Sequence, residues 1–289
     1  MSFLQVIVLA ILQGLAELLP VSSSAHVVVA EKLMGLDPSA PAMTLLLVML
    51  HTGTMFAVIV YFWRRWRETY FASMAQFKRT AVQVILATFL TGVIYEGVVL
   101  LLEKTAFRGA PHAEIEDLFN HLELIAPALA AGGILILLAG LRAGRNGATR
   151  RPADAELTTR QAGIIGAVQG LCLPFRGFSR SGATISVGML MGVGKAAAEN
   201  FSFALAVVLT PAVVARETLR VLHAEHAGGA AALASAAVPS LVGAAVAFVA
   251  GLVALKWLSG WLENGRWYLF GVYCLVAAAA VGGLYFAGY

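Results

Sequence analysis

Six long apolar runs dominate this sequence, and each is close to the length that an α-helix needs to cross a lipid bilayer. About 20 predominantly apolar residues are enough to span the hydrocarbon core. Only 12% of the 289 residues are charged, while 60% are hydrophobic. The sequence therefore predicts an all-α polytopic membrane protein with six spanning helices. They are expected at about residues 42–63, 82–102, 122–141, 198–221, 236–258 and 267–287.

Two further apolar segments are interrupted midway. Residues 1–35 and 160–194 each contain Pro, Gly, Ser and charged side chains near their centre, and neither half of either segment is long enough to span. Such breaks are tolerated at membrane depth only where protein or a wet cavity surrounds them. We therefore predict two re-entrant helical hairpins, each entering the membrane and returning on the same side.

The two interrupted segments resemble each other. Both "QGLAELLPVSSSAH" at 13–26 and "QGLCLPFRGFSRSGAT" at 169–184 start with Gln-Gly-Leu, reach a proline and continue into a serine-rich turn, 156 residues apart. Three spans follow each segment, and an odd number of spans inverts the second half relative to the first. This predicts an inverted-topology repeat with a site at the interface of the repeats. The single membrane domain, 1–289, would comprise half 1–142, a cytoplasmic loop 143–159 and half 160–289.

The loop charges predict the orientation of the chain. Segments 64–80 and 142–160 are rich in arginine, whereas the segment between them, 103–121, is rich in acidic residues. The positive-inside rule places the two basic segments in the cytoplasm and the acidic one outside. The first hairpin then opens to the outside. Because topology explains the basic residues, the net charge of +4 gives no reason to expect nucleic-acid binding.

The first interruption carries polar groups that a lipid-facing helix does not need. Gln13 and Glu17 are four residues apart and share one helix face. Pro20 stops that helix, and Ser22–Ser24 are N-cap residue types for a second helix, whose first turn would contain His26. Ionisable groups at membrane depth cost at least about 2.5–3.5 kcal/mol each. We therefore interpret Glu17 and His26 as functional.

The second interruption has the composition of an anion site. Pro174 and Gly177 break the helix, and hydroxyl groups and one arginine follow. A helix N-terminus with hydroxyls and an arginine binds anions, and phosphate is a common occupant. The residues concerned are Ser179, Arg180, Ser181 and Thr184.

Structural alternatives stay open for several of these residues. Capping alone would explain any one serine of Ser22–Ser24, and Gln13 fits helix–helix hydrogen bonding equally well. His51 lies within a predicted span among small neighbours, and we interpret it mainly as a packing residue.

Together the two segments resemble the signature motifs of the bacterial undecaprenyl-pyrophosphate phosphatase family, also called the bacitracin-resistance family. The first motif of that family is (E/Q)xxxE running into PVSSxxH, and the second is PGxSRSxxT. "VYFWRRW" at 60–66 and "ENFSFALAV" at 199–207 also resemble family segments. The similarity extends over nearly the whole chain.

The resemblance implies an integral enzyme of the cytoplasmic (inner) membrane that hydrolyses undecaprenyl pyrophosphate to undecaprenyl phosphate. This reaction recycles the lipid carrier of peptidoglycan synthesis and confers bacitracin resistance. The resemblance also implies a site facing the outer side and a divalent cation, Mg²⁺ or Ca²⁺. By position, the implied catalytic residues are Glu17, Ser23, His26 and Arg180. The implied phosphate-binding residues are Ser22, Ser179, Arg180, Ser181 and Thr184, and the implied metal ligands are Glu17 and, more weakly, Gln13.

Two departures from the family pattern are visible. Gln13 stands where many members have glutamate, which removes one carboxylate ligand. The second motif reads "PFRGFSRS", so Phe175 and Arg176 separate Pro174 from Gly177.

Several questions stay open at this point. Attack by Ser23, activated by Glu17 or His26, and direct attack by water are both compatible with the sequence. The competing function is a lipid-phosphate flippase or anion transporter, since inverted repeats are typical of transporters. The expected partners are the polyprenyl pyrophosphate substrate and the membrane lipids. The oligomeric state, including a homodimer, stays open.

Overall fold

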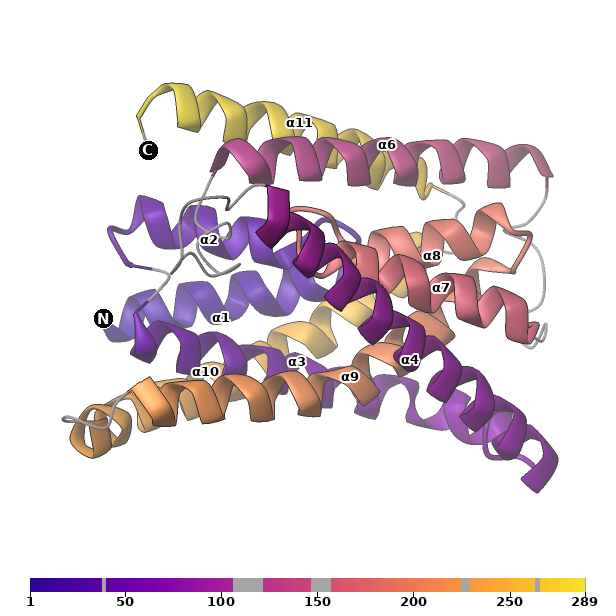
Figure 1. The fold of residues 1–289 in the computed structure, drawn as a ribbon, viewed down its shortest axis with the longest axis horizontal. Helices are drawn as coiled ribbons and strands as arrows, with labels where there is room; N and C mark the ends of the chain where they lie inside the picture. Colours follow the sequence, from indigo (N-terminus) through magenta and orange to yellow (C-terminus); the bar gives the residue numbers. More distant parts are fainter. Residues whose placement is uncertain (38–39, 106–121, 147–156, 225–228, 263–265, 289) are drawn as a thin grey trace.

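Ten α-helices make up the described part of this computed structural model. It describes residues 1–37, 40–105, 122–146, 157–224, 229–262 and 266–288 (Figure 1). The first five helices are α1 (Phe3–Leu18), α2 (Ser23–Leu33), α3 (Pro41–Thr69), α4 (Met74–Thr105) and α6 (Leu122–Asn146). The other five are α7 (Thr159–Cys172), α8 (Arg180–Leu190), α9 (Lys195–Ala224), α10 (Gly229–Leu262) and α11 (Tyr268–Phe286).

The six predicted spans are all present. The helices long and apolar enough to cross a membrane are Ala42–Thr69, Met74–Lys104, Leu122–Ala143, Lys195–Arg216, Ala237–Lys256 and Tyr268–Phe286. The remaining four helices form the two predicted hairpins. The longest of them, α1, has 16 residues and measures about 24 Å, short of the roughly 30 Å hydrocarbon core. Their lengths fit re-entrant hairpins.

The two hairpins open at opposite ends of the molecule. In Figure 1, α1 and α2 open at the left end, where both chain termini lie, and α7 and α8 open at the right end. The helix packing also repeats between the two halves. Helix α1 packs against α10, and the equivalent helix of the second half, α7, packs against α4, the equivalent of α10. The chain is therefore an inverted-topology repeat.

The repeat extends to individual hydrogen bonds at the open ends of the hairpins. Ser2 and Gln5 form a capping box at the start of α1, and Thr158 and Gln161 form the same box at the start of α7. Each glutamine also donates its side-chain Nε2 to the carbonyl at the end of its own hairpin, Gln5 to Met34 and Gln161 to Met191. The same contact thus closes the open end of both hairpins.

Equivalent glycines bring each hairpin against its neighbouring span. A Cβ on Gly14 would lie 2.7 Å from the carbonyl oxygen of Ala247 in α10, and one on Gly170 would lie 2.4 Å from that of Thr91 in α4. Both approaches are too close for any side chain at these positions. The Gln-Gly pairs noted in the sequence therefore mark helix crossings.

The interruptions are built by two left-handed backbone conformations. Ser22, the residue before α2, has φ 66°, and Gly177, in the turn between α7 and α8, has φ 103°. A Cβ on Gly177 would also lie 2.6 Å from the carbonyl oxygen of Ile125 in α6. Glycine therefore supports the turn despite the insertion of Phe175 and Arg176.

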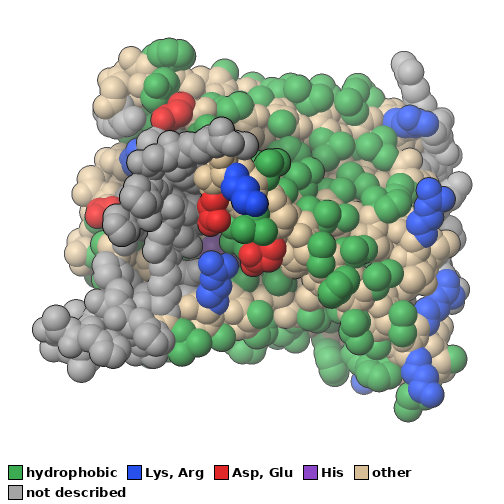
Figure 2. All heavy atoms as spheres, in the orientation of Figure 1, with side chains coloured by type: hydrophobic (Ala, Val, Ile, Leu, Met, Phe, Trp, Pro, Cys, Tyr) green, Lys and Arg blue, Asp and Glu red, His purple; other side chains and the backbone are tan. Residues whose placement is uncertain are grey.

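The surface separates an apolar belt from a basic end. Figure 2 shows hydrophobic side chains across the middle of the visible face and Lys and Arg side chains along its right edge. Exposed basic residues at that end come from the ends of α3, α4, α6 and α7: Arg64, Arg65, Arg67, Lys78, Arg79, Arg142 and Arg160. Some charged residues of the segments used to predict the orientation lie outside the described residues: Arg150, Arg151, Glu114, Glu116 and Asp117.

Candidate functional site

Glu17 is the centre of a polar cluster at the end of α1. Its Oε2 accepts hydrogen bonds from Ser23 Oγ at 2.5 Å and from Gln13 Nε2 at 3.0 Å. Gln13 is one helical turn earlier, whereas Ser23 follows the break and begins α2. The turn at Leu19–Ser22 thus folds the start of α2 back onto the end of α1.

Arg180 reaches the same carboxylate from the other half of the chain. Its NH2 group donates to Glu17 Oε1 at 2.7 Å, and the two side chains are only 20% and 15% exposed. The two interruptions also touch directly, since Ser181 Oγ donates to the carbonyl of Leu19 at 3.4 Å. The repeat therefore brings the two breaks together.

Two helices begin at this meeting point. The N-cap residue of α2, Ser22, makes no side-chain capping bond, and among the described residues the backbone N–H groups of Ser23 and Ser24 find no acceptor. At α8, Ser179 Oγ accepts from the N–H of Gly182, which leaves the first N–H groups of that helix open within the described part. Open N–H groups and the positive ends of two helix dipoles favour an anion here.

His51 belongs to this cluster, although the sequence favours a packing role. Its Nδ1 lies 2.8 Å from the carbonyl oxygen of Leu47, which can only accept, so Nδ1 carries a proton. Its Nε2 then faces Glu17 Oε2 at 3.6 Å. A signal that could have found it is its position in the middle of a span, where an ionisable side chain is costly.

A small cavity of about 20 Å³ lies beside these groups. It is lined by Glu17, Arg180 and His51, with Thr54 of α3 and Thr210 of α9. The volume is enough for about one water molecule. The polar cluster therefore borders an open space, as a reacting group would require.

His26 lies elsewhere on α2. Its Nδ1 is 2.7 Å from the carbonyl oxygen of Ser22, and its Nε2 is 2.7 Å from the hydroxyl of Tyr273 in α11. Among the described contacts it makes none with Glu17. The structure thus separates two residues that the sequence places in one catalytic group.

The remaining predicted phosphate ligands have structural partners. Ser22 Oγ pairs with Ser24 Oγ at 3.3 Å, Ser179 caps the start of α8, and Ser181 Oγ donates to the carbonyl of Leu19. Thr184 is fully buried, and its hydroxyl lies 2.6 Å from that of Ser202 in α9. Thr184 therefore packs against α9, and its hydroxyl is also within hydrogen-bond distance of the carbonyl of Arg180.

The site is asymmetric although the fold is a repeat. With the offset of 156 residues, Glu17 corresponds to Leu173 and Arg180 corresponds to Ser24. Each half therefore lacks the charged group that the other supplies. One complete carboxylate–guanidinium pair forms where the halves meet, and the mirrored position cannot form a second.

The side-chain oxygen atoms of Glu17 and Gln13 are of the kind that can bind a divalent cation. Gln13 Oε1 is fully buried with no hydrogen-bond partner among the described residues, and it adjoins the Glu17 carboxylate. No group of three or more His, Cys, Asp or Glu side chains forms a ligand cluster in the described part of the chain. Mg²⁺ commonly binds through one or two carboxylates, waters and substrate phosphates, so one glutamate and an amide oxygen are compatible with such an ion.

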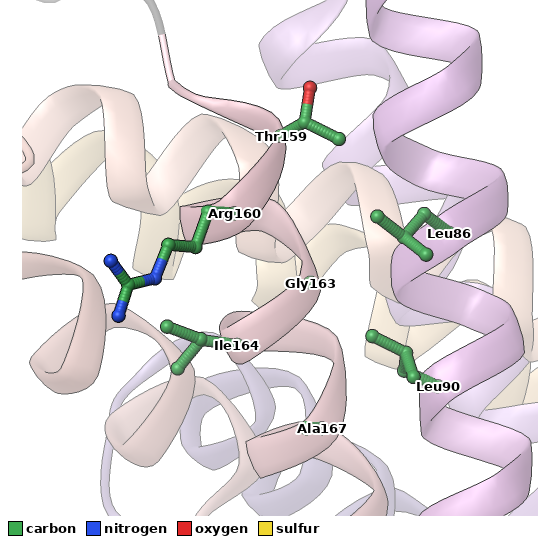
Figure 3. Close-up of a pocket in the computed structure, with 7 residues that line it drawn as sticks. All are labelled: Leu86, Leu90, Thr159, Arg160, Gly163, Ile164 and Ala167. Carbon is green, nitrogen blue, oxygen red and sulfur yellow. The ribbon is translucent and has the colours of Figure 1, made fainter.

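A larger groove of about 340 Å³ lies away from these groups, between α4 and α7 (Figure 3). Leu86 and Leu90 line it from α4, and Gly163 and Ala167 line it from α7. Its lining is apolar apart from Thr159 and Arg160 at the basic end. Because no residue of the polar cluster borders it, this groove is not the candidate site.

Comparison with known proteins agrees with the sequence motifs. The profile of the family described as "Bacitracin resistance protein BacA" matches residues 6–280. A protein of Acinetobacter baylyi named "Undecaprenyl-diphosphatase 2" is 58% identical over 285 residues, covering 97% of both chains. A protein of the same name from Burkholderia thailandensis is 36% identical, covering 96% of this chain and 95% of its own.

Proposed function

This chain belongs to the bacitracin resistance protein BacA family and is an undecaprenyl-diphosphatase, and we propose that the cluster around Glu17 is where it cleaves its substrate. The observation that carries this proposal is the meeting of Glu17, Ser23 and Arg180 at the starts of α2 and α8. A diphosphate is an anion, and this is the place in the described structure where open helix N-termini and an arginine converge.

Arg180 and the helix N-termini would bind the diphosphate. A guanidinium presents a planar fork that matches phosphate oxygens, and charge on the transferred phosphoryl group grows in the transition state. Arg180 is held by Glu17 in the resting site, so its orientation is set before the substrate arrives. The prenyl chain would leave the break sideways into the lipid.

Ser23 would attack the terminal phosphorus, with Glu17 as its base. The hydroxyl already donates to Glu17 Oε2 at 2.5 Å, the arrangement of an activated nucleophile. In this route the Ser23 proton passes to Glu17, the bond to the lipid phosphate breaks, and water later hydrolyses the phosphoserine. Direct attack by water would use the same Glu17 without the covalent step.

A divalent ion bound by Glu17 and Gln13 would neutralise charge on the phosphate oxygens. Chelation with EDTA should then abolish phosphate release, and added Mg²⁺ or Ca²⁺ should restore it. Binding of Mn²⁺ to the substrate-free protein, followed by electron paramagnetic resonance, should weaken in Glu17→Gln.

The chain is a multi-pass protein of the bacterial inner membrane, and we place its site on the outer side. The basic end in Figure 2 is the end at which α7 and α8 open in Figure 1, and basic residues favour the cytoplasm. The α1–α2 hairpin, which carries Glu17 and Ser23, would then open to the periplasm.

The test is phosphate release from undecaprenyl diphosphate by purified protein in detergent, where no membrane sidedness exists. Wild type should release phosphate, and Glu17→Gln and Arg180→Ala should be slower by at least about 100-fold. Ser24→Ala is a matched control, because Ser24 is beside Ser23 and its hydroxyl hydrogen-bonds only to that of Ser22 among the described side chains. Equal rates in all four proteins would overturn the site.

A further inference from the structure

Glu31 is a buried carboxylate that the cluster around Glu17 does not use. It lies near the end of α2, its side chain is fully buried, and neither of its carboxylate oxygens finds a hydrogen-bond partner among the described residues. An ionised group without partners is costly in an apolar interior, so a buried carboxylate requires a compensating positive charge. The positive charge that acts on Glu31 is the guanidinium of Arg176. A second pair of opposite charges therefore joins the two halves of the chain.

Packing against α6 brings these two charges to the same place. Val28, one turn before Glu31 on the same face of α2, belongs to a buried apolar cluster that contains Ile125 of α6. Gly177, which follows Arg176, packs so closely on α6 that a Cβ there would lie 2.6 Å from the carbonyl oxygen of Ile125. The end of α2 and the turn at Arg176 therefore lie against one stretch of α6.

Arg176 occupies the second position of a tight turn. The N–H of Phe178 donates to the carbonyl of Phe175 at 3.1 Å, and Gly177 at the third position has φ 103°. A positive φ at the third position is characteristic of a type II turn, in which proline is favoured at the second position because its ring presets φ. The family motif PGxSRSxxT has proline there, directly before the glycine. Arg176 lacks this constraint, so another interaction has to restrict the turn.

The turn determines where Arg180 lies. It ends at Ser179, which caps α8, and Arg180 begins that helix and donates to Glu17. A shift of the turn would therefore move the guanidinium that binds the diphosphate. We propose that Glu31 is a positioning residue that holds this turn through Arg176 and thereby orients Arg180. The inference rests on the proposed function of the site.

The first test removes the charges singly and together. Glu31→Gln keeps the shape of the side chain and leaves Arg176 without its counter-charge, and Arg176→Gln does the reverse. Each should lower kcat/KM for phosphate release about 10- to 100-fold, as a small displacement of a catalytic group does. Because the two residues share one interaction, the double variant Glu31→Gln/Arg176→Gln should be no slower than either single variant. Additive losses would overturn the pair.

Proline provides a rescue that a purely structural role of Glu31 does not predict. In Glu31→Gln/Arg176→Pro the ring restricts the turn and no buried charge is left unpaired, so most of the wild-type kcat/KM should return. No recovery relative to Glu31→Gln would overturn the proposal. If a single variant does not fold, recovery of a thermal transition in this double variant supports the pair, and its absence refutes it.

Lys32→Gln is the matched control, because it removes the neighbouring charge of α2 and should keep wild-type kinetics. All variants are compared at pH 8, since burial disfavours the charged form of a carboxylate and a higher pH favours it. If Glu31→Gln has the same kinetics as Lys32→Gln, the pair has no role in the reaction.

A double-mutant cycle with Arg180 separates positioning from a general loss of stability. If Glu31 acts through Arg180, Glu31→Gln should have little further effect on kcat/KM in an Arg180→Lys protein. A full additional loss would show that Glu31 acts on the fold and not on Arg180.

The outcome is separable from that of the proposed site. A fully active Glu31→Gln beside an inactive Glu17→Gln would remove only the pair. An active Glu17→Gln would instead remove the site itself, whatever the Glu31 result.

Discussion

Arg180 and Glu17, 163 residues apart in the sequence, form a 2.7 Å ion pair at the point where the two halves of the chain meet. Each residue lies beside the break in one of the two helical hairpins, and neither has a charged counterpart at the equivalent position of the other half. The pair therefore turns a symmetric fold into an asymmetric site.

Replacing Arg180 by lysine should not restore function. Lysine keeps the charge but lacks the planar fork that can bind Glu17 and a phosphate oxygen together. We expect Arg180→Lys to lose at least about tenfold in kcat/KM, measured by phosphate release. Because the two residues share one interaction, the losses in Arg180→Lys and Glu17→Gln should not add in the double variant. Additive losses would mean that they act separately.

Ser23→Ala should stop turnover if the hydroxyl is the nucleophile. We expect a loss of at least about 1,000-fold, and rapid acid quenching of wild type should trap a phosphoserine that mass spectrometry places at Ser23. Ser24→Ala should keep near-normal rates. Hydrolysis at a near-normal rate in Ser23→Ala would establish direct attack by water.

His51→Ala should slow hydrolysis, because it removes the nitrogen that faces Glu17 across the cavity. We expect about a tenfold or larger fall in kcat. Thr52→Ala is the matched control, since among the described residues this neighbouring hydroxyl donates a hydrogen bond only to the carbonyl of Val48 in its own helix. If both variants have wild-type kinetics, His51 is a packing residue after all.

Gly170→Ala should destabilise the fold, because its Cβ would lie 2.4 Å from a backbone oxygen in α4. Overpacking of this kind costs about 1–3 kcal/mol, which should appear as a lower thermal midpoint in detergent. Gly92→Ala in α4 meets nothing within 4 Å and should be neutral or slightly stabilising. Similar midpoints for the two variants would contradict the close crossing.

The orientation can be read from cysteine labelling in intact cells. Lys78→Cys lies at the basic end and should react with a membrane-impermeant maleimide only after the inner membrane is permeabilised. Asp37→Cys lies just after α2 and should react from the periplasm. The native Cys172 and Cys274 are buried and should stay unlabelled. The reverse pattern would overturn the assigned orientation of the chain.

The sequence by itself determined the elements and their order. Spans follow from the length of apolar runs, and hairpins follow from Pro, Gly and Ser near the middle of runs that are too short. The repeat follows from two similar segments and an odd number of spans. All of these are local patterns, because hydrogen bonding in a membrane forces each apolar segment to satisfy its own backbone.

Only the tertiary structure decided which side chains meet. Glu17, Ser23 and Arg180 could be expected near each other once the breaks were paired, but the entry of His51 depends on how α3 is rotated in the bundle. The same holds for His26, which turns to Tyr273, and for Thr184, which turns to α9. Motif spacing fixes a residue's place along its helix, whereas its neighbours are set by packing between helices far apart in the chain.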